Sequence, residues 1–182
     1  MSKAIGLVEY KTVPKGIEAA DGMLKASEVR ILFSSPICPG KYVTVIGGKV
    51  DSVRTAVDRA VAIGDLFTIE SHVIPNVHPS VIPAITATVE ISEMKALGVV
   101  ETISAIAAIK AGDVAAKAAA VCLVEIRIAR GLGGKGFVLF TGDLGSVEAS
   151  MQACERELGE EGGIVSVAVI PAPHGDLVSY IV

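Results

Sequence analysis

The sequence predicts an α/β protein of the α+β kind, made of two small domains in tandem. Three observations lead to this fold class: an internal repeat, the same alternation of strand-like and helix-like segments in both copies, and a composition that can form a folded core. The chain has 182 residues, which suits one ordinary domain or two small ones. With 51% hydrophobic and 20% charged residues, it is not a disordered chain.

The chain repeats itself, and the matching segments keep their order. They are, first copy and then second, 3–9 with 95–101, 25–26 with 117–118, 40–41 with 134–135, and 74–78 with 170–174. The offset grows from 92 residues at the first pair to 96 at the last, so the second copy contains short insertions. Self-similarity of this kind indicates a duplicated domain. We therefore expect one domain over residues 3–86 and another over 95–182, with a linker near 83–94.

Each copy has the predicted element order βαββαβ. In the first copy we expect a strand at 4–10, a helix after Thr12, strands at 29–34 and 42–46, a helix after Asp51 or Ser52, and a strand at 67–74. Thr12 is a candidate N-cap residue, which a helix start favours. Ile17, Ala20 and Leu24 follow at helical spacing and form one apolar face. This order is the ferredoxin-like arrangement, an antiparallel sheet with two helices on one face.

Charge and hydropathy exclude several classes of partner. The chain has 16 Lys and Arg against 20 Asp and Glu, so it lacks the basic surface that binding to nucleic acid requires. The most apolar stretch, 105–129, is interrupted by charged residues and does not predict a membrane span. The first residues lack the apolar core of a signal peptide. Three cysteines at unrelated positions argue against a disulfide framework and for the reducing cytosol.

The composition also predicts association of several copies. The mean hydropathy is +0.60, although only 4% of the residues are aromatic, so we infer that apolar surface is buried between subunits. Two small domains with sheet edges favour side-by-side packing. If that packing continues around an axis, three chains close a ring of six domains.

The motifs of both copies resemble those of bacterial microcompartment shell proteins of the tandem-domain type. The resemblance is carried by 4–9 and 23–26, by the glycines around the third strand, and by the Ile-Pro-x-x-His sequence that closes each copy. Segment 35–41, with the sequence SPICPGK, is very similar to the pore loop of the iron–sulfur shell proteins of propanediol utilisation. The resemblance covers almost the whole chain and implies a homotrimer that forms a pseudohexameric tile.

By this resemblance, Cys38 is the metal ligand. Proteins of this type bind one [4Fe–4S] cluster per trimer on the three-fold axis, through one pore-loop cysteine from each subunit. Thiolates are the normal ligands of such clusters. The pore-loop residues expected beside Cys38 are Ser35, Pro36, Ile37, Pro39 and Gly40 in the first copy and Arg130, Gly131, Leu132, Gly133 and Gly134 in the second. Because the second copy has no cysteine here, a trimer supplies three thiols rather than six.

The resemblance implies a structural shell tile in the cytoplasm, located in the microcompartment shell, and not an enzyme. No Ser/His/Asp arrangement stands out, and Glu9 and Glu101 repeat at strand ends that a ring would hold apart. The cluster would pass electrons across the shell or be delivered intact to enzymes inside. The implied partners are further copies of the chain, other shell proteins and encapsulated redox enzymes.

Four residues are expected at the tile edges by the same resemblance. They are Lys25, Lys117, His78 and His174. The two histidines follow proline-containing turns, and we expect them to make backbone or edge contacts rather than to bind metal. Many family members carry arginine two residues before the closing histidine, whereas this chain has Asn76 and Ala172. Its edge packing is therefore expected to be weaker or differently made.

Two other functions remain open from the sequence. One is a cluster-free tile with a pore for small polar metabolites, lined by Ser34, Ser35 and Lys41 or by the glycine segment 131–134. The other is a ligand-sensing trimer of ferredoxin-like domains. Cys122 and Cys154 have no counterparts in the other copy, and we expect both to be structural.

Overall fold

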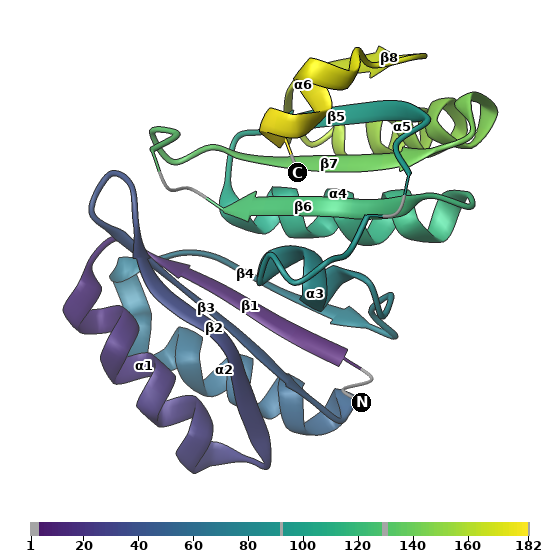
Figure 1. Ribbon diagram of the computed structural model, residues 1–182. Coiled ribbons are helices and arrows are strands. Elements are labelled where there is room, and N and C mark those ends of the chain that lie inside the picture. The colour runs from purple at the N-terminus through teal and green to yellow at the C-terminus, as the bar shows by residue number, and fades with distance from the viewer. Residues whose placement is uncertain (1–3, 92, 129–130, 182) are drawn as a thin grey trace. The chain divides into compact units, whose positions relative to one another are not determined.

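The computed structural model describes residues 4–91, 93–128 and 131–181, which divide into two compact units (Figure 1). The first unit contains the described residues up to Val77 together with 131–134. The second contains His78–Ile128 and the described residues from Lys135 onward. Segment 78–86, which the sequence repeat assigned to the first domain, therefore packs with the second unit.

The first unit is an antiparallel sheet of four strands with two helices on one face (Figure 1). Its elements are β1 (Ala4–Tyr10), α1 (Val13–Ala26), β2 (Val29–Ile37), β3 (Lys41–Gly48), α2 (Val50–Gly64), the 3-10 turn η1 (Asp65–Phe67) and β4 (Thr68–Pro75). The strand order is β2-β3-β1-β4, so β1 and β3 are the inner strands. The predicted element order and fold class are confirmed.

The apolar face that the sequence predicts on α1 is only partly buried. Ala20 is 6% exposed, but Ile17 and Leu24 are 54% and 45% exposed. The helix meets the core instead through small residues and Met23, which is fully buried. A Cβ atom at Gly16 would lie 2.3 Å from the Tyr42 ring, so this approach is too close for larger side chains. Ile17 and Leu24 consequently lie at the surface.

The helix starts differ slightly from those expected. Thr12 occupies the N-cap position of α1, but its side chain makes no capping hydrogen bond. Helix α2 begins after Lys49, rather than after Asp51 or Ser52. Its apolar face is buried as the spacing requires, with Val53, Ala56 and Ala60 fully enclosed.

The second unit repeats the same topology with two additional helices. Its elements are α3 (Val81–Ile85), β5 (Ala96–Thr102), α4 (Ala105–Ala118), β6 (Cys122–Ile128), β7 (Gly136–Gly142), α5 (Leu144–Leu158), β8 (Ile164–Ile170) and α6 (Gly175–Ile181). The strand order β6-β7-β5-β8 matches that of the first unit. Helix α3 packs against α4 and β6. No helix in the described ranges is both long and apolar enough to cross a lipid bilayer.

Candidate metal centre and assembly surfaces

Cys38 lies in the tight turn that joins β2 to β3. Ile37 and Lys41 pair directly across these strands, so Cys38, Pro39 and Gly40 form the tip of the turn. The Cys38 residue is partly exposed, and its peptide bond to Pro39 is cis. Gly40 has a φ of +81°, a left-handed conformation that favours glycine. The thiol is therefore placed at the end of the sheet, within reach of solvent.

The strand below the turn is held firmly in the sheet. Ile37 is only 4% exposed. The Ser34 hydroxyl donates to the Tyr42 hydroxyl at 3.0 Å and lies 3.2 Å from Thr44 Oγ1. Ser35 donates to the carbonyl oxygen of Pro36 at 3.2 Å. Ser34, one of the hydroxyls expected to line a metabolite pore, is thus engaged within the sheet.

The glycine segment of the second copy lies against the same turn. Segment 131–134 belongs to the first compact unit, and a Cβ atom at Gly134 would lie 3.5 Å from the Cys38 carbonyl oxygen and from Pro39 Cδ. Gly131, Gly133 and Gly134 have φ values of +75°, +64° and +97°, which L-residues with side chains rarely adopt. The two predicted pore loops are therefore brought together. Arg130, predicted in the same loop, lies outside the described residues.

A buried ion pair sits at the start of β3, next to the turn. Lys41 Nζ donates to Glu9 Oε1 at 2.7 Å, and the Glu9 side chain has no exposed surface. Glu9 Oε2 has no hydrogen-bond partner among the described residues. The second copy repeats the pair as Lys135 and Glu101 at 3.3 Å, with the Glu101 side chain 33% exposed. Each glutamate thus pairs with a lysine of its own repeat.

The other two cysteines occupy different environments. Cys154 is fully buried and donates to the Ala111 carbonyl oxygen at 3.4 Å. Burial, with smaller contributions from Glu157 and Glu155, raises the pKa of the Cys154 thiol to about 12, so it stays protonated. Cys122 is exposed, because it is the first residue of an edge strand. Of the two cysteines expected to be structural, Cys154 therefore lies in the packed core, whereas Cys122 lies at the surface.

The lysines expected at the tile edges form matching ion pairs that differ in burial. Lys25 Nζ lies 2.6 Å from Asp21 Oδ2, and the two side chains are 74% and 59% exposed. Lys117 pairs with Asp113 in the same way, but the Asp113 side chain is only 8% exposed. Asp21 and Asp113 stand at equivalent positions of the repeat, as the two lysines do, but the repeat does not distinguish their burial.

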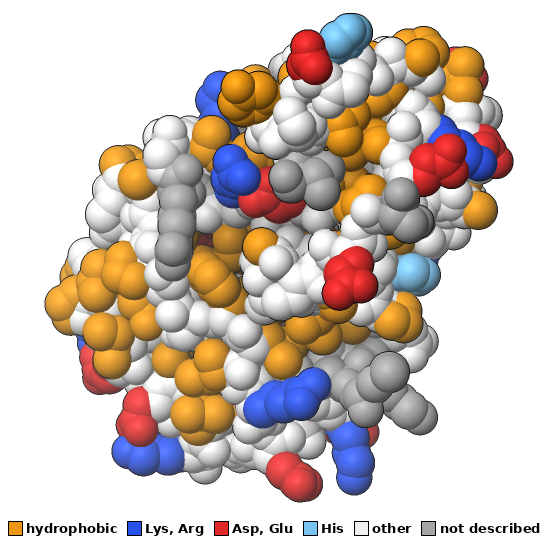
Figure 2. Space-filling view, viewed as in Figure 1, with side chains coloured by type: hydrophobic (Ala, Val, Ile, Leu, Met, Phe, Trp, Pro, Cys, Tyr) orange, Lys and Arg blue, Asp and Glu red, His pale blue; other side chains and the backbone are white. Residues whose placement is uncertain are grey.

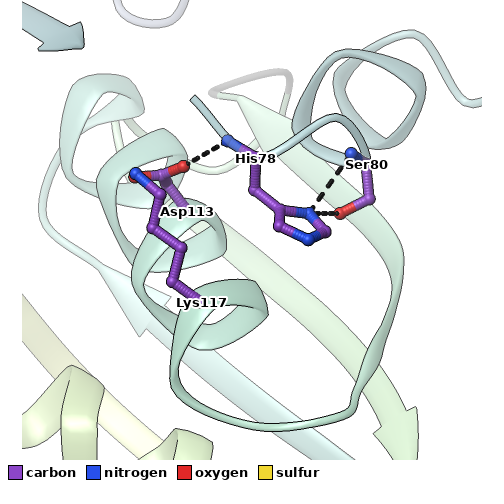
Figure 3. Close-up of polar contacts among 4 residues, drawn as sticks. All are labelled: His78, Ser80, Asp113 and Lys117. Atoms are coloured by element: carbon purple, nitrogen blue, oxygen red, sulfur yellow. Dashed lines mark hydrogen bonds and ion pairs between the residues drawn. The ribbon is translucent and has the colours of Figure 1, made fainter. Parts of the chain in front are cut away.

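His78 contacts Asp113 through its backbone (Figure 3). The His78 backbone N–H donates to Asp113 Oδ1 at 2.7 Å, and the His78 ring Nδ1 lies 2.7 Å from Ser80 Oγ. The predicted backbone contact of this histidine is present, but its aspartate partner was not foreseen. The available signal was the Asp-x-x-x-Lys pattern that both copies share. The repeated His174 is exposed, and its Nδ1 accepts from the Asp176 N–H at 3.2 Å.

Comparison with known proteins decides what kind of chain this is. The sequence matches the BMC domain family twice, over residues 4–77 and 96–173. The chain belongs to the BMC-domain family of bacterial microcompartment shell proteins. Because the two BMC domains follow one another, it is a tandem-domain member, as the internal repeat predicted.

Relatives of this BMC protein include both tandem and shorter chains. It is 40% identical over 174 residues to the bacterial microcompartment shell protein PduT of Citrobacter freundii, covering 96% of this chain and 95% of PduT. The shell protein EutM of Salmonella typhimurium is 40% identical over 84 residues, which are 46% of this chain and 85% of EutM. A crystal structure of a microcompartments protein from Desulfitobacterium hafniense superposes with a TM-score of 0.93 at 45% identity, covering 98% and 99% of the two chains.

Proposed function

We propose that this BMC protein is a homotrimeric shell tile whose three Cys38 thiolates hold one [4Fe–4S] cluster at its central opening. The observation that carries the proposal is the position of Cys38. It is a partly exposed thiol at the tip of the β2–β3 turn, and only one of the two copies contains it. The shell role itself follows from the family and is shared by relatives such as PduT and EutM.

The residues around Cys38 fit a thiolate ligand. Buried Ile37 holds the backbone on one side of the thiol, and Pro39 restricts it on the other. Gly134 leaves space beside the turn that a side chain would fill. The remaining cysteines do not compete for the site. The Cys154 thiol is buried and protonated, and Cys122 lies at the far end of β6 from the β6–β7 turn.

Three-fold assembly supplies the ligands that one chain lacks. Among the described residues, no three His, Cys, Asp or Glu side chains gather into a metal-binding group. Three copies around an axis turn one cysteine position into three ligands. The fourth iron would take a non-protein ligand or a thiol from elsewhere.

A bound cluster would supply one-electron transfer. Within the chain, Cys38 would hold iron, while the turn residues keep its thiol at the end of the sheet. The Lys41–Glu9 pair leaves no unpaired lysine charge at the start of β3. The tile would carry electrons across the shell or deliver clusters to redox enzymes inside, and it would pack beside other shell proteins.

The decisive experiment is anaerobic iron and sulfide analysis, with EPR of the reduced protein, on wild type, Cys38→Ser and Cys122→Ser after identical reconstitution. We expect one cluster per trimer in the wild type and in Cys122→Ser, the matched control with an exposed cysteine. Cys38→Ser should lose the cluster and its EPR signal. Equal loading of Cys38→Ser and wild type would refute the assignment of Cys38.

The same samples separate the proposal from its alternatives. A wild-type trimer without iron would exclude the cluster and favour a tile with an open pore for small polar metabolites. A wild type that binds small effectors, as measured by thermal shift, but never associates into flat sheets would favour a ligand-sensing trimer.

A further inference from the structure

Strand β8 forms an open edge of the second sheet. It pairs with β5 on one side, and the order β6-β7-β5-β8 leaves its other side without a neighbouring strand among the described residues. Val165, Ser166 and Ala168 are exposed along it, and Figure 2 shows hydrophobic side chains at the surface where β8 lies. A row of backbone N–H and C=O groups is therefore available to a further strand.

The composition of β8 favours pairing with another strand. Its seven residues, IVSVAVI, include five valines and isoleucines and contain no charged residue, proline or glycine. Branched side chains of this kind fit the pleated surface of a sheet, whereas charges and prolines are the usual protection of an open edge. The sequence of β8 therefore contains nothing that keeps a second strand away.

The equivalent strand of the first unit, β4, carries such protection. Glu70 of β4 pairs with Glu9 as Ser166 of β8 pairs with Glu101, so Glu70 and Ser166 occupy equivalent positions. Two residues further on, β4 has His72 where β8 has Ala168. One edge thus carries ionisable side chains and the other does not. Because both edges belong to the same type of domain, the fold does not impose this difference.

The sequence of β8 is also nearly the same when it is read backwards. Val167 is its centre, and residues of similar kind stand at equal distances on either side. These pairs are Ile164 with Ile170, Val165 with Val169, and Ser166 with Ala168. Two antiparallel copies of the strand, related by a two-fold axis at Val167, bring the members of each pair opposite one another. The symmetry of the sequence therefore matches one particular occupant of the edge, which is β8 of a second copy.

We propose that the β8 edges of two copies of this chain pair antiparallel about a two-fold axis at Val167, which joins two four-stranded sheets into one. The contact is isologous, so it closes after two strands and cannot by itself build a ring. In the trimer proposed above, each β8 pairs once, and two trimers form an assembly of six chains. The inference uses that trimer only for the expected mass, and it does not depend on the cluster.

The side chains on both faces of the joined sheet are compatible with this pairing. Val167 pairs with the buried Val100 within the chain, so Val165, Val167 and Val169 share the face of the sheet that carries Val100. Across the axis these valines meet valines of the other copy, and cross-strand contacts between branched side chains stabilise a sheet. On the opposite face the small Ser166 and Ala168 meet, so the contact buries no charged side chain of β8.

The first test places a cysteine at the proposed axis. In a Cys38→Ser/Cys122→Ser background, the remaining Cys154 is buried and does not compete for oxidation. Val167→Cys in this background should form a disulfide-linked dimer under mild oxidation, because the axis places position 167 opposite itself at a separation that a disulfide can span. Non-reducing electrophoresis measures the linked fraction.

The matched control is Val165→Cys, on the same face of β8 in the same background. Position 165 lies opposite position 169 of the other copy, so Val165→Cys alone should remain unlinked. Adding Val169→Cys to Val165→Cys should restore the linkage. This pattern distinguishes the proposed register from random collisions between exposed thiols.

The second test uses charge at two exposed positions of β8. Sedimentation velocity of iron-free wild type is expected to give about six times the chain mass of 18.7 kDa. Ser166→Lys/Ala168→Lys places lysine opposite lysine across the axis and should halve that mass. Ser166→Glu/Ala168→Lys changes the same positions but places glutamate opposite lysine, so it should keep the mass of the wild type. Circular dichroism reports whether each variant is folded.

A Val167→Cys variant that stays unlinked, or one that links no better than Val165→Cys, would overturn the pairing. A wild type that remains at three chains over a concentration series would also overturn it, while leaving the trimer in place. A wild type of two chains whose Val167→Cys variant links would support the β8 contact and refute the trimer. Because all of these measurements use iron-free protein, none of them depends on the cluster.

Discussion

In the second BMC domain the first helix is enclosed, with Ile109 fully buried, whereas the equivalent Ile17 of the first domain is 54% exposed. The two domains share topology and strand order, so this difference does not come from their own folds. It arises because segment 78–86 follows the first domain and packs on the second. One domain therefore has a covering segment on its first helix, and the matching face of the other domain is exposed.

The turns between the second and third strands differ as well. The first domain has Cys38 between two prolines, and the second has a glycine-rich segment in the corresponding place. Gly134 lies against the Cys38 turn, where it adds no side chain. The two copies thus differ at this turn, with a cysteine in one and a run of glycines in the other.

The two cores differ in the residue that packs against the glycine of the first strand. Phe140 is fully buried, and a Cβ atom at Gly98 would lie 2.3 Å from its ring. Its repeat counterpart Ile46 is buried near Gly6. We expect Phe140→Ala to lower the free energy of unfolding of the second unit by about 3–5 kcal/mol, and Ile46→Ala to lower that of the first by about 2–4 kcal/mol. Denaturant unfolding measures both, and a loss below about 1 kcal/mol in either would contradict the packing described.

The two aspartates provide a sharper comparison. Asp113→Ala removes the acceptor of the His78 N–H and the partner of Lys117, so we expect a loss of about 1–3 kcal/mol in unfolding free energy. Asp21→Ala removes only an exposed ion pair and should change the free energy of unfolding by about 0.5 kcal/mol or less. Equal losses at the two positions would show that the difference in burial has no energetic consequence.

The helix N-caps differ by a single hydrogen bond. The Ser104 hydroxyl accepts from the Ala107 N–H at 3.1 Å at the start of α4, whereas Thr12 makes no such bond at α1. Ser104→Ala should therefore lower the free energy of unfolding by about 1 kcal/mol, and Thr12→Ala should lower it by only about 0.3 kcal/mol. Thermal unfolding of the two variants, compared with the wild type, measures both losses of stability. A larger loss of stability for Thr12→Ala than for Ser104→Ala would contradict the capping role of Ser104.

The last comparison concerns the reactivity of the Cys122 and Cys154 thiols, which at neutral pH has the smallest expected effect on stability. Burial raises the pKa of Cys154 from 9.0 to about 12, so its thiol should resist alkylation at pH 8, whereas the exposed Cys122 should react. The unfolded chain releases this proton at lower pH than the folded chain does. Stability is therefore complete below about pH 8.5 and falls as the pH rises toward 12. Mass spectrometry after timed alkylation measures the first expectation, and unfolding at a series of pH values measures the second. Equally fast labelling of Cys122 and Cys154 in folded protein would contradict the burial of Cys154.

The local sequence pattern was sufficient to predict the strands and helices of each domain. The strand at 4–10 was predicted with the bounds of β1, and the repeat revealed the duplication and the order βαββαβ. These features depend on short-range spacing, which one sequence contains in full. The motif around Cys38 also placed it correctly in the turn between two adjacent strands.

Burial was harder to predict, because it depends on which element comes to lie on a surface. The spacing of Ile17, Ala20 and Leu24 indicates an apolar face but does not say what covers it. Cys122 lies in an apolar run and is nevertheless exposed, since β6 is an edge strand. The sequence by itself determined the duplicated domain, its strand and helix order and the proline-flanked cysteine. Only the tertiary structure decided that segment 78–86 packs on the second domain, because burial is set by contacts between elements distant in sequence, whereas secondary structure is set largely by neighbours along the chain.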